Sequence, residues 1–323
     1  MQPTTTTKNN NKLRIVFMGT PEFAAFILKQ LILQNYTVVA VVTVADKPAG
    51  RGKKLKQSAV KELAVAKNIA VLQPTNLKDE AFITQLSSFN ADVFVVVAFR
   101  MLPQVVWSMP ARGCFNLHAS LLPQYRGAAP INWAIINGEQ KTGVTTFFLD
   151  EKIDTGAIIK QHEIAIEINE TAGSLHDKLM HIGADLVCDT LDHIENQTIE
   201  PIPQKTETIK EAPKLFKENC KIDWEQSAEQ VYNKIRGLSP YPTAWCLVKD
   251  QEELITIKLY EAVIDRQEHH LKAGTIIRSK KELKVATADY FIKLKTFQLP
   301  AKKKMNVEAL LNGLNWTAEA HML

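Results

Sequence analysis

An asparagine and a histidine stand two residues apart in FNLHASLLPQYRG, residues 115–127. Asn116 and His118 lie on a predicted strand, where residues two apart project to the same face. The turn SLLPQYRG that follows cannot continue the strand ladder. An amide and an imidazole side by side can both donate to an oxygen that gains negative charge. The pattern indicates an oxyanion site; the alternative is a hydrogen-bonded pair in the core.

Two aspartates follow the predicted strand GVTTFFL, in the segment DEKIDTGAII at residues 150–159. A carboxylate beside the imidazole would hold its orientation and raise its pKa, giving a proton-transfer group for neutral pH. The alternative for either aspartate is a cap on its own turn. Spacing alone does not choose between Asp150 and Asp154.

Common cofactor signatures are absent from the sequence. The turn after the first predicted strand reads GTPEFA, with a lone glycine where a dinucleotide fold needs GxGxxG. In GRGKK, Lys54 stands where a phosphate-binding P-loop needs Ser or Thr. The histidines show no HExxH spacing, Ser120 lacks a GxSxG motif, and the cysteines form no CxxC pair. The sequence therefore predicts no NAD, no ATP and no metal.

Short apolar segments alternate with helical patterns in the first half of the chain. LRIVFM (13–18), VVAVVTV (38–44) and the unbroken run DVFVVVAF (92–99) predict strands, and EFAAFILKQLI (22–32) has helical spacing. Unbroken apolar strands are expected where helices cover both sheet faces. We predict an α/β fold with a doubly wound, mainly parallel sheet of the Rossmann-like type. In such sheets ligands bind at the carboxyl ends of the strands, where Asn116 and His118 would stand.

The length of 323 residues allows two domains. We predict a solvated tail over 1–12, a catalytic domain over 13–198 that closes with a helix at 174–194, and a Thr- and Pro-rich linker over 199–213. Short alternating segments follow, and they predict a smaller, OB-like β-barrel over 214–323.

Basic residues concentrate in two segments, although the net charge is only +4. Residues 271–304 hold ten Lys or Arg against Glu282 and Asp289, and DKPAGRGKKLK at 46–56 holds five. Such segments contact polyanions. The alternatives are a solvated loop and a strand edge that carries Lys against aggregation.

The opening stretch MQPTTTTKNNNK lacks the apolar core of a signal peptide. No apolar run approaches the roughly 20 residues that span a bilayer. Separated cysteines are typical of reduced thiols. We therefore expect a cytoplasmic protein that does not insert into membranes.

Five motifs together resemble the methionyl-tRNA formyltransferase family, within the superfamily that uses 10-formyltetrahydrofolate. They span about residue 13 to about residue 315: MGTPEFA, DKPAGRGKK, FNLHASLLPQYRGAAPINWAIINGE, TGVTTFFLDEKIDTG and KIDWEQSAEQVYNKIRGLSPYPTAW. The resemblance implies formyl transfer from 10-formyltetrahydrofolate to the α-amine of methionine on initiator tRNA, with no obligate protein partner evident. The nearest alternative is a sugar-nucleotide formyltransferase, whose small acceptor would not use the basic segments. Hydrolysis of the donor and a vestigial RNA-binding protein are further alternatives.

Site residues also follow from this resemblance. The family's catalytic residues match Asn116, His118 and Asp154. Its folate-binding residues match Ser120, Leu121, Leu122 and Pro123, and its pterin loop matches Ala98, Phe99, Arg100, Met101 and Leu102. Its tRNA-contacting arginine matches Arg51, and the two basic segments add Lys53, Lys54, Lys302, Lys303 and Lys304 as phosphate contacts.

The pterin loop departs from the family pattern. The chain reads AFRMLP, one residue shorter than the usual AYG-containing loop, with Arg100 in place of a glycine. We expect contacts through the backbone to survive this change. We also expect Tyr125 and Arg126 to brace the SLLP turn against the helix that follows.

Overall fold

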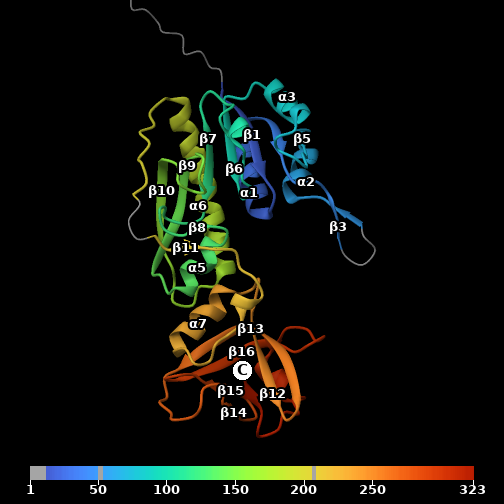
Figure 1. Ribbon diagram of the computed structural model, residues 1–323, viewed down its shortest axis with the longest axis vertical. Coiled ribbons are helices and arrows are strands. Elements are labelled where there is room, and N and C mark those ends of the chain that lie inside the picture. Colours follow the sequence, from blue (N-terminus) through green and yellow to red (C-terminus); the bar gives the residue numbers. More distant parts are fainter. Residues whose placement is uncertain (1–11, 50–53, 206–208) are drawn as a thin grey trace, which may run out of the picture. The chain divides into compact units, whose positions relative to one another are not determined.

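The computed structural model describes residues 12–49, 54–205 and 209–323 (Figure 1). The chain forms two compact units. The first comprises residues 1–123, 144–162 and 179–207, and the second comprises 124–143, 163–178 and 208–323. This division differs from the domain boundaries expected from the sequence, which remain a prediction.

A seven-stranded sheet organises the first unit, in the order β10-β9-β7-β6-β1-β2-β5. The five strands from β7 to β5 are parallel neighbours, and β9 runs antiparallel to β7. The predicted Rossmann-like, mainly parallel sheet is confirmed. Its strands are β1 (Arg14–Gly19), β2 (Thr37–Val42), β5 (Ala70–Leu72), β6 (Val93–Val97), β7 (Cys114–His118), β9 (Lys141–Phe148) and β10 (Ile158–Ala165).

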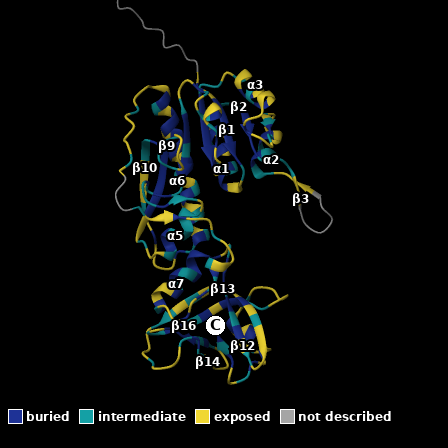
Figure 2. Ribbon diagram, in the orientation of Figure 1, coloured by how far each residue is buried: buried dark blue, intermediate teal, exposed yellow. Residues whose placement is uncertain are grey.

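Helices cover both faces of this sheet, which is why its central strands are apolar on both sides. Phe82 of α3 and Val106 of α4 join one buried cluster with Val96 and Cys114, whereas Gly183 of α6 lies against Leu117 on the other face. Figure 2 shows β1 buried along most of its length. The helices of this unit are α1 (Glu22–Leu33), α2 (Ala59–Ala66), α3 (Glu80–Ser88), α4 (Gln104–Trp107) and most of α6 (Ala172–Glu195), whereas α5 (Pro130–Ile136) belongs to the second unit.

The basic insertion is not an irregular loop in its described part. Strands β3 (Lys47–Ala49) and β4 (Lys54–Lys56) pair as an antiparallel ribbon. Asp46 anchors the base, since its carboxylate lies 2.6 Å from Lys61 Nζ and accepts a hydrogen bond from Gln73 Nε2 at 2.7 Å. The ribbon therefore leaves the sheet from a fixed point.

The stretch predicted as a linker makes specific backbone pairs. In the first unit Ile202 forms an antiparallel bridge with Ile158. In the second unit β11 (Glu211–Ala212) pairs in parallel with β8 (Arg126–Gly127). Isolated pairs of this kind require no side-chain periodicity, so the sequence pattern did not reveal them.

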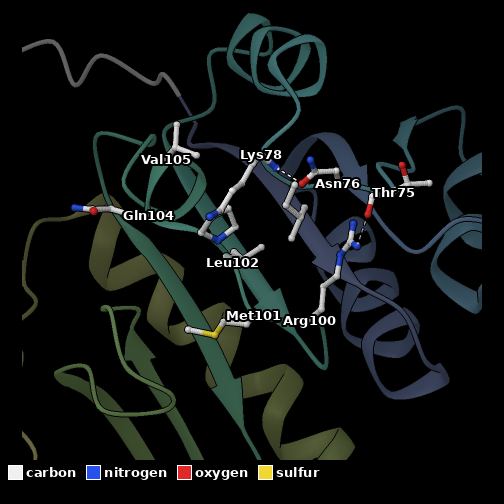
Figure 3. Close-up of a pocket in the computed structure, with 10 residues that line it drawn as sticks. Thr75, Asn76, Lys78, Arg100, Met101, Leu102, Gln104 and Val105 are labelled. Atoms are coloured by element: carbon white, nitrogen blue, oxygen red, sulfur yellow. Dashed lines mark hydrogen bonds between the residues drawn. The ribbon is translucent and has the colours of Figure 1, made fainter.

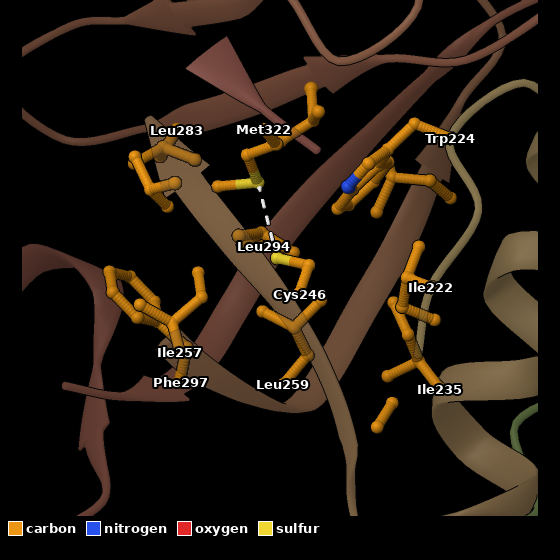
Figure 4. Close-up of a cluster of buried hydrophobic side chains, with 14 of the residues drawn as sticks. Ile222, Trp224, Ile235, Cys246, Ile257, Leu259, Leu283, Leu294, Phe297 and Met322 are labelled. Atoms are coloured by element: carbon orange, nitrogen blue, oxygen red, sulfur yellow. Dashed lines mark hydrogen bonds between the residues drawn. The ribbon is translucent and has the colours of Figure 1, made fainter. Parts of the chain in front are cut away.

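The second unit contains an antiparallel, nearly closed barrel, as predicted. Its sheet has the order β14-β15-β16-β13-β12-β18, and a bridge between Thr275 and His321 links the two ends. Figure 4 shows apolar side chains converging on its interior, including Ile257, Leu259 and Phe297, all fully buried. The elements are the 3-10 turn Glu218–Cys220, α7 (Ala228–Gly237), β12 (Ala244–Asp250), β13 (Glu253–Asp265), β14 (Ile276–Arg278), β15 (Leu283–Ala286), β16 (Phe291–Gln298), β17 (Met305–Asn306), α8 (Val307–Leu311) and β18 (His321–Met322).

Candidate active site

Strand β7 presents Asn116 and His118 near its carboxyl end. Asn116 pairs with Val96 of β6 and Phe147 of β9, and His118 pairs with Thr145 of β9. The two side chains share one sheet face because they are two residues apart on an extended strand. Asn116 is half-buried and His118 is only 6% exposed. The strand thus holds an amide and a shielded imidazole at the edge where parallel sheets bind ligands.

Asp154 is the aspartate that lies against the histidine. Its Oδ2 is 3.8 Å from His118 Nδ1, and both side chains are largely shielded from solvent. Asp150 instead caps its own turn: its Oδ1 accepts hydrogen bonds from the Lys152 amide at 3.0 Å and the Thr155 hydroxyl at 2.7 Å. The turn-cap alternative therefore holds for Asp150, and Asp154 is the carboxylate beside the imidazole.

The loop that carries Asp154 has little freedom. Asp154 has a φ of +55°, a left-handed conformation that Asp adopts more readily than most residues. A Cβ on Gly156 would lie 1.7 Å from the Phe148 carbonyl oxygen, so only glycine fits there. Gln204 Nε2 donates to the carbonyls of Asp154 at 3.0 Å and Gly156 at 2.8 Å. These contacts fix the carboxylate beside His118.

Thr145 and Gln161 hold the SLLP turn. The Thr145 hydroxyl donates to the Ser120 carbonyl at 2.6 Å and accepts from the Leu122 amide at 3.1 Å. Gln161 Nε2 donates to the Leu122 carbonyl at 2.8 Å and to Thr145 Oγ1 at 2.9 Å. Sequence reasoning missed both residues, and Gln204 as well, because each acts on a segment at least sixteen positions away in the chain.

The four residues expected to line the folate site differ in exposure. Ser120 and Leu122 are buried, at 0% and 3% exposed, whereas Leu121 and Pro123 are half-buried. A ligand at this turn would therefore meet the side chains of Leu121 and Pro123, while Ser120 and Leu122 contribute through the backbone and the packing of the turn.

The loop expected to bind the pterin begins beside the histidine. Val97 pairs with Leu117, so Ala98, with φ +46°, leaves β6 at the level of His118. The Arg100 guanidinium donates to the carbonyls of Pro74 and Thr75, the latter at 3.0 Å. The arginine that replaces the usual glycine therefore fastens this loop to the segment after β5. Phe99 is half-buried, Leu102 is buried and Met101 is 65% exposed.

Tyr125 braces its turn as expected. Its hydroxyl donates to Glu139 Oε1 at 2.5 Å and accepts from Asn137 Nδ2 at 3.2 Å, and both partners follow α5. Burial, together with the bond to Glu139, raises the pKa of this hydroxyl. Arg126 lies in β8, where its backbone pairs with Glu211.

The residues expected to contact tRNA occupy separate segments. Arg51 and Lys53 lie outside the described residues, and Lys54 begins β4. Lys302, Lys303 and Lys304 are consecutive and exposed between β16 and β17.

Part of the basic cluster at 271–304 is neutralised inside the second unit. Lys284 pairs with Asp265 and Lys293 with Glu282, both close contacts. Lys304 Nζ lies 3.6 Å from Glu261 Oε1 and 4.9 Å from the centre of the Tyr260 ring. These lysines have partners within the barrel, so the sequence total of charge overstates the cationic surface.

Among residues 12–49, 54–205 and 209–323, no group of three His, Cys, Asp or Glu side chains is placed to hold a metal ion. None of the helices in these ranges is long and apolar enough to cross a bilayer.

Comparison with known proteins gives a consistent family. Residues 13–191 match the formyl transferase family and residues 214–315 match the formyl transferase C-terminal domain. A methionyl-tRNA formyltransferase of Flavobacterium johnsoniae is 61% identical over 310 residues, which cover 96% of this chain and 98% of the relative. The chain belongs to the methionyl-tRNA formyltransferase family.

Solved structures of other formyltransferase-fold proteins share its architecture. HypX from Aquifex aeolicus in complex with tetrahydrofolic acid superposes with a TM-score of 0.63 at 18% identity, over 93% of this chain and 47% of HypX, so this chain spans about half of that protein. An N-formyltransferase from Helicobacter canadensis, in complex with folinic acid and dTDP-3-aminofucose, gives 0.62 at 19% identity, over 91% of this chain and all of the relative. At these identities the likeness establishes the fold.

Proposed function

We propose that this chain transfers the formyl group of 10-formyltetrahydrofolate to the α-amino group of methionyl initiator tRNA, in the cytoplasm, at the start of translation. The observation that carries the proposal is that the Asp154 carboxylate lies beside His118, and that β7 holds both His118 and Asn116. Membership of the methionyl-tRNA formyltransferase family supports the acceptor, and the folate ligands named for the two solved relatives support the donor class.

The barrier of this reaction lies at the formyl carbon. The methionine amine attacks that carbon and forms a tetrahedral adduct with a negatively charged oxygen. Asn116 Nδ2 and a ring N–H of His118 would donate to this oxygen. One such donor contributes roughly 2.7–4 kcal/mol in a site that excludes water. The low exposure of His118 meets this condition.

A proton must move from the attacking amine to N10 of the departing folate. Asp154, directly or through one water, would accept the ammonium proton and return it to N10 as the C–N10 bond breaks. The formyl carbon keeps its oxidation state, so the step needs no external oxidant. Acid and base assistance of this kind typically adds about 10²- to 10⁴-fold. Asp154 would also hold the orientation of His118.

The acceptor is expected to bind through its phosphates. The insertion that carries Arg51, Lys53 and Lys54 supplies cations on one segment. Lys302, Lys303 and Lys304 supply them on a second, where Lys304 also lies 3.6 Å from Glu261. Binding through phosphates weakens steeply as salt rises, because counterions compete for the same contacts. We expect the KM for tRNA to rise with salt while the KM for the donor changes much less.

A three-acceptor assay tests the reaction. Labelled 10-formyltetrahydrofolate is supplied with charged initiator tRNA, with a sugar-nucleotide amine, and alone. Label is expected on the charged tRNA only. Transfer to the sugar amine would assign the chain to small acceptors, and release of formate alone would make it a hydrolase.

Two neighbouring aspartates provide a matched test of the site. Asp154→Asn retains a side chain that tolerates positive φ but removes the charge beside His118. Asp150→Asn keeps the oxygen that caps its turn. We expect the first variant to lose single-turnover rate by about 10²-fold or more and the second to stay near wild type. Equal rates for the two variants would remove Asp154 from the mechanism.

A further inference from the structure

Three loops carry the predicted site residues, and each is fastened by a side chain that reaches across to a distant segment. The Arg100 guanidinium fastens the loop after β6 to the Thr75 carbonyl (Figure 3). The Thr145 hydroxyl holds the SLLP turn. The Gln204 amide holds the loop that carries Asp154. Of these three fastening residues, Gln204 belongs to the stretch that the sequence predicts as a linker.

Gln204 differs in burial from the residues around it. Residues 201–203 and 205 are exposed, whereas Gln204 is half-buried. Its Nε2 donates to the Asp154 carbonyl at 3.0 Å and to the Gly156 carbonyl at 2.8 Å. A side-chain amide carries two N–H bonds, and here two carbonyls match them. A polar side chain that turns inward from an exposed segment and holds two carbonyls of one turn fixes the position of that turn.

Backbone pairing places Gln204 in register with this turn. Ile202 and Ile158 form an antiparallel bridge, with an N–O distance of 2.8 Å in each direction. In an antiparallel register the residue two positions after Ile202 lies opposite the residue two positions before Ile158, so Gln204 is opposite Gly156. The prolines on either side of Ile202, in PIPQ, restrict the backbone there. The linker therefore delivers this amide to one place.

The Asp154 carboxylate has little margin in its position. Its Oδ2 lies 3.8 Å from His118 Nδ1, which is longer than a hydrogen bond of about 3.2 Å, and catalytic contacts of this kind tighten when substrate binds. In an active site, a misplacement of about 1 Å can cost on the order of 10²-fold in rate. Gln204 holds the carbonyl of Asp154 itself, so a shift of this peptide would move the carboxylate directly.

We propose that Gln204 is a positioning residue for formyl transfer. By holding the carbonyls of Asp154 and Gly156, it keeps the Asp154 carboxylate within reach of His118 and of the proton that leaves the attacking amine. The inference rests on the proposed function, and it makes the predicted linker a working part of the catalytic site. A purely structural role for Gln204 would instead lower stability and leave the rate of the folded protein unchanged.

Gln204→Met tests this role on the full chain, because methionine has a similar length but no N–H to donate. In single-turnover formylation of charged initiator tRNA, we expect the rate to fall on the order of 10- to 100-fold, with little change in the KM for either substrate. Gln204→Asn keeps the amide on a side chain one methylene shorter and should recover part of the rate. Gln85→Met is the matched control, the same change at an exposed glutamine of α3, and should match wild type.

A double variant separates positioning from stability. If Gln204 acts through Asp154, Gln204→Met should lose most of its effect on the rate in an Asp154→Asn background, because residues that act on one another are not additive. Two effects that multiply in full would overturn the inference. So would a Gln204→Met protein with a lower midpoint of thermal unfolding but a wild-type rate per folded molecule. Either result leaves formyl transfer intact, whereas absence of transfer by wild type would count against the proposed function.

Discussion

The end of β7 and the interior of the barrel are both shielded from water, but they bury different chemistry. Around β7, Ser120, Thr145 and His118 are at most 6% exposed, and the turn is held by hydrogen bonds to Thr145 and Gln161. The barrel interior contains apolar side chains such as Leu259 and Phe297, both at 0% exposure.

This contrast separates two uses of burial. Apolar burial stabilises the barrel without fixing a particular orientation of polar groups. Buried hydrogen bonds contribute little net stability but are costly to break, so they define one geometry for the turn and for the histidine. Substitutions in the barrel interior should therefore change stability, and substitutions at β7 should change the reaction.

The largest effect is expected from Phe297→Ala. This substitution removes a fully buried ring that stacks on Trp316 at a centroid distance of 6.3 Å. We expect the free energy of unfolding to fall by about 3–5 kcal/mol, measured by urea denaturation with tryptophan fluorescence. Leu254→Ala, at a residue 61% exposed on β13, should change it by less than about 0.5 kcal/mol. Similar losses for both would mean that the barrel core is not packed as described.

Asn116→Ala should have the opposite effect: it should lower the rate of the reaction and leave stability nearly unchanged. The side chain is half-buried at a strand end, so the midpoint of thermal unfolding should stay near wild type. Loss of one oxyanion donor should lower kcat by about 10²- to 10³-fold, or 2.7–4 kcal/mol. Single-turnover formylation measures this effect directly. Wild-type turnover in this variant would show that Asn116 does not contact the reacting oxygen.

Thr145→Val is expected to lower both the stability of the protein and its affinity for the donor. The substitution keeps the shape of the side chain but removes a hydroxyl that hydrogen-bonds to the Ser120 carbonyl, the Leu122 amide and Gln161 Nε2. Leaving buried groups unpaired costs about 1–3 kcal/mol, and a loosened turn should raise the KM for the donor. Thr145→Ser retains the hydroxyl and should recover most of both losses. A valine variant with normal stability and normal KM would refute the role of Thr145 in holding the turn.

The smallest expected effect is the pH-dependent contribution of Asp289 to the stability of the second unit. Burial raises the pKa of Asp289, but hydrogen bonds from the Ala228 and Tyr290 amides and the Thr287 hydroxyl outweigh it and hold the pKa below its usual value. The Asp289 carboxylate therefore stabilises the fold above the unfolded-state pKa, about 3.9, and this contribution disappears as pH falls through the lower folded-state pKa.

Asp289→Asn provides the measurement for this effect. Because Ala228 begins α7, the lost charge at a helix N-terminus should cost about 0.3–1 kcal/mol at neutral pH. The difference from wild type should vanish in acid, as followed by denaturation from pH 7 downward. A difference that persists unchanged after the Asp289 carboxyl is protonated in the folded protein would rule out this carboxylate as its source.

Local pattern was sufficient for the elements and for part of the site. Apolar runs and helical spacing predicted β1, β2, β6, α1 and α6, and the two-residue period of a strand placed Asn116 and His118 on one face. Resemblance to the formyltransferases implied Asp154. These features depend on neighbours in sequence, or on motifs that stay contiguous, so they can be recognised without the fold.

Tertiary structure decided which groups meet. It supplied the physical reason for Asp154 over Asp150, since only the turn conformation shows that Asp150 is occupied as a cap. It also brought Gln161 and Gln204 onto the SLLP turn and the Asp154 loop. It paired Lys284 and Lys293 with acids, so the charge counted along the sequence is not all available to a polyanion. Contacts between residues far apart in the chain depend on how the strands are ordered and registered, and no local pattern encodes that order.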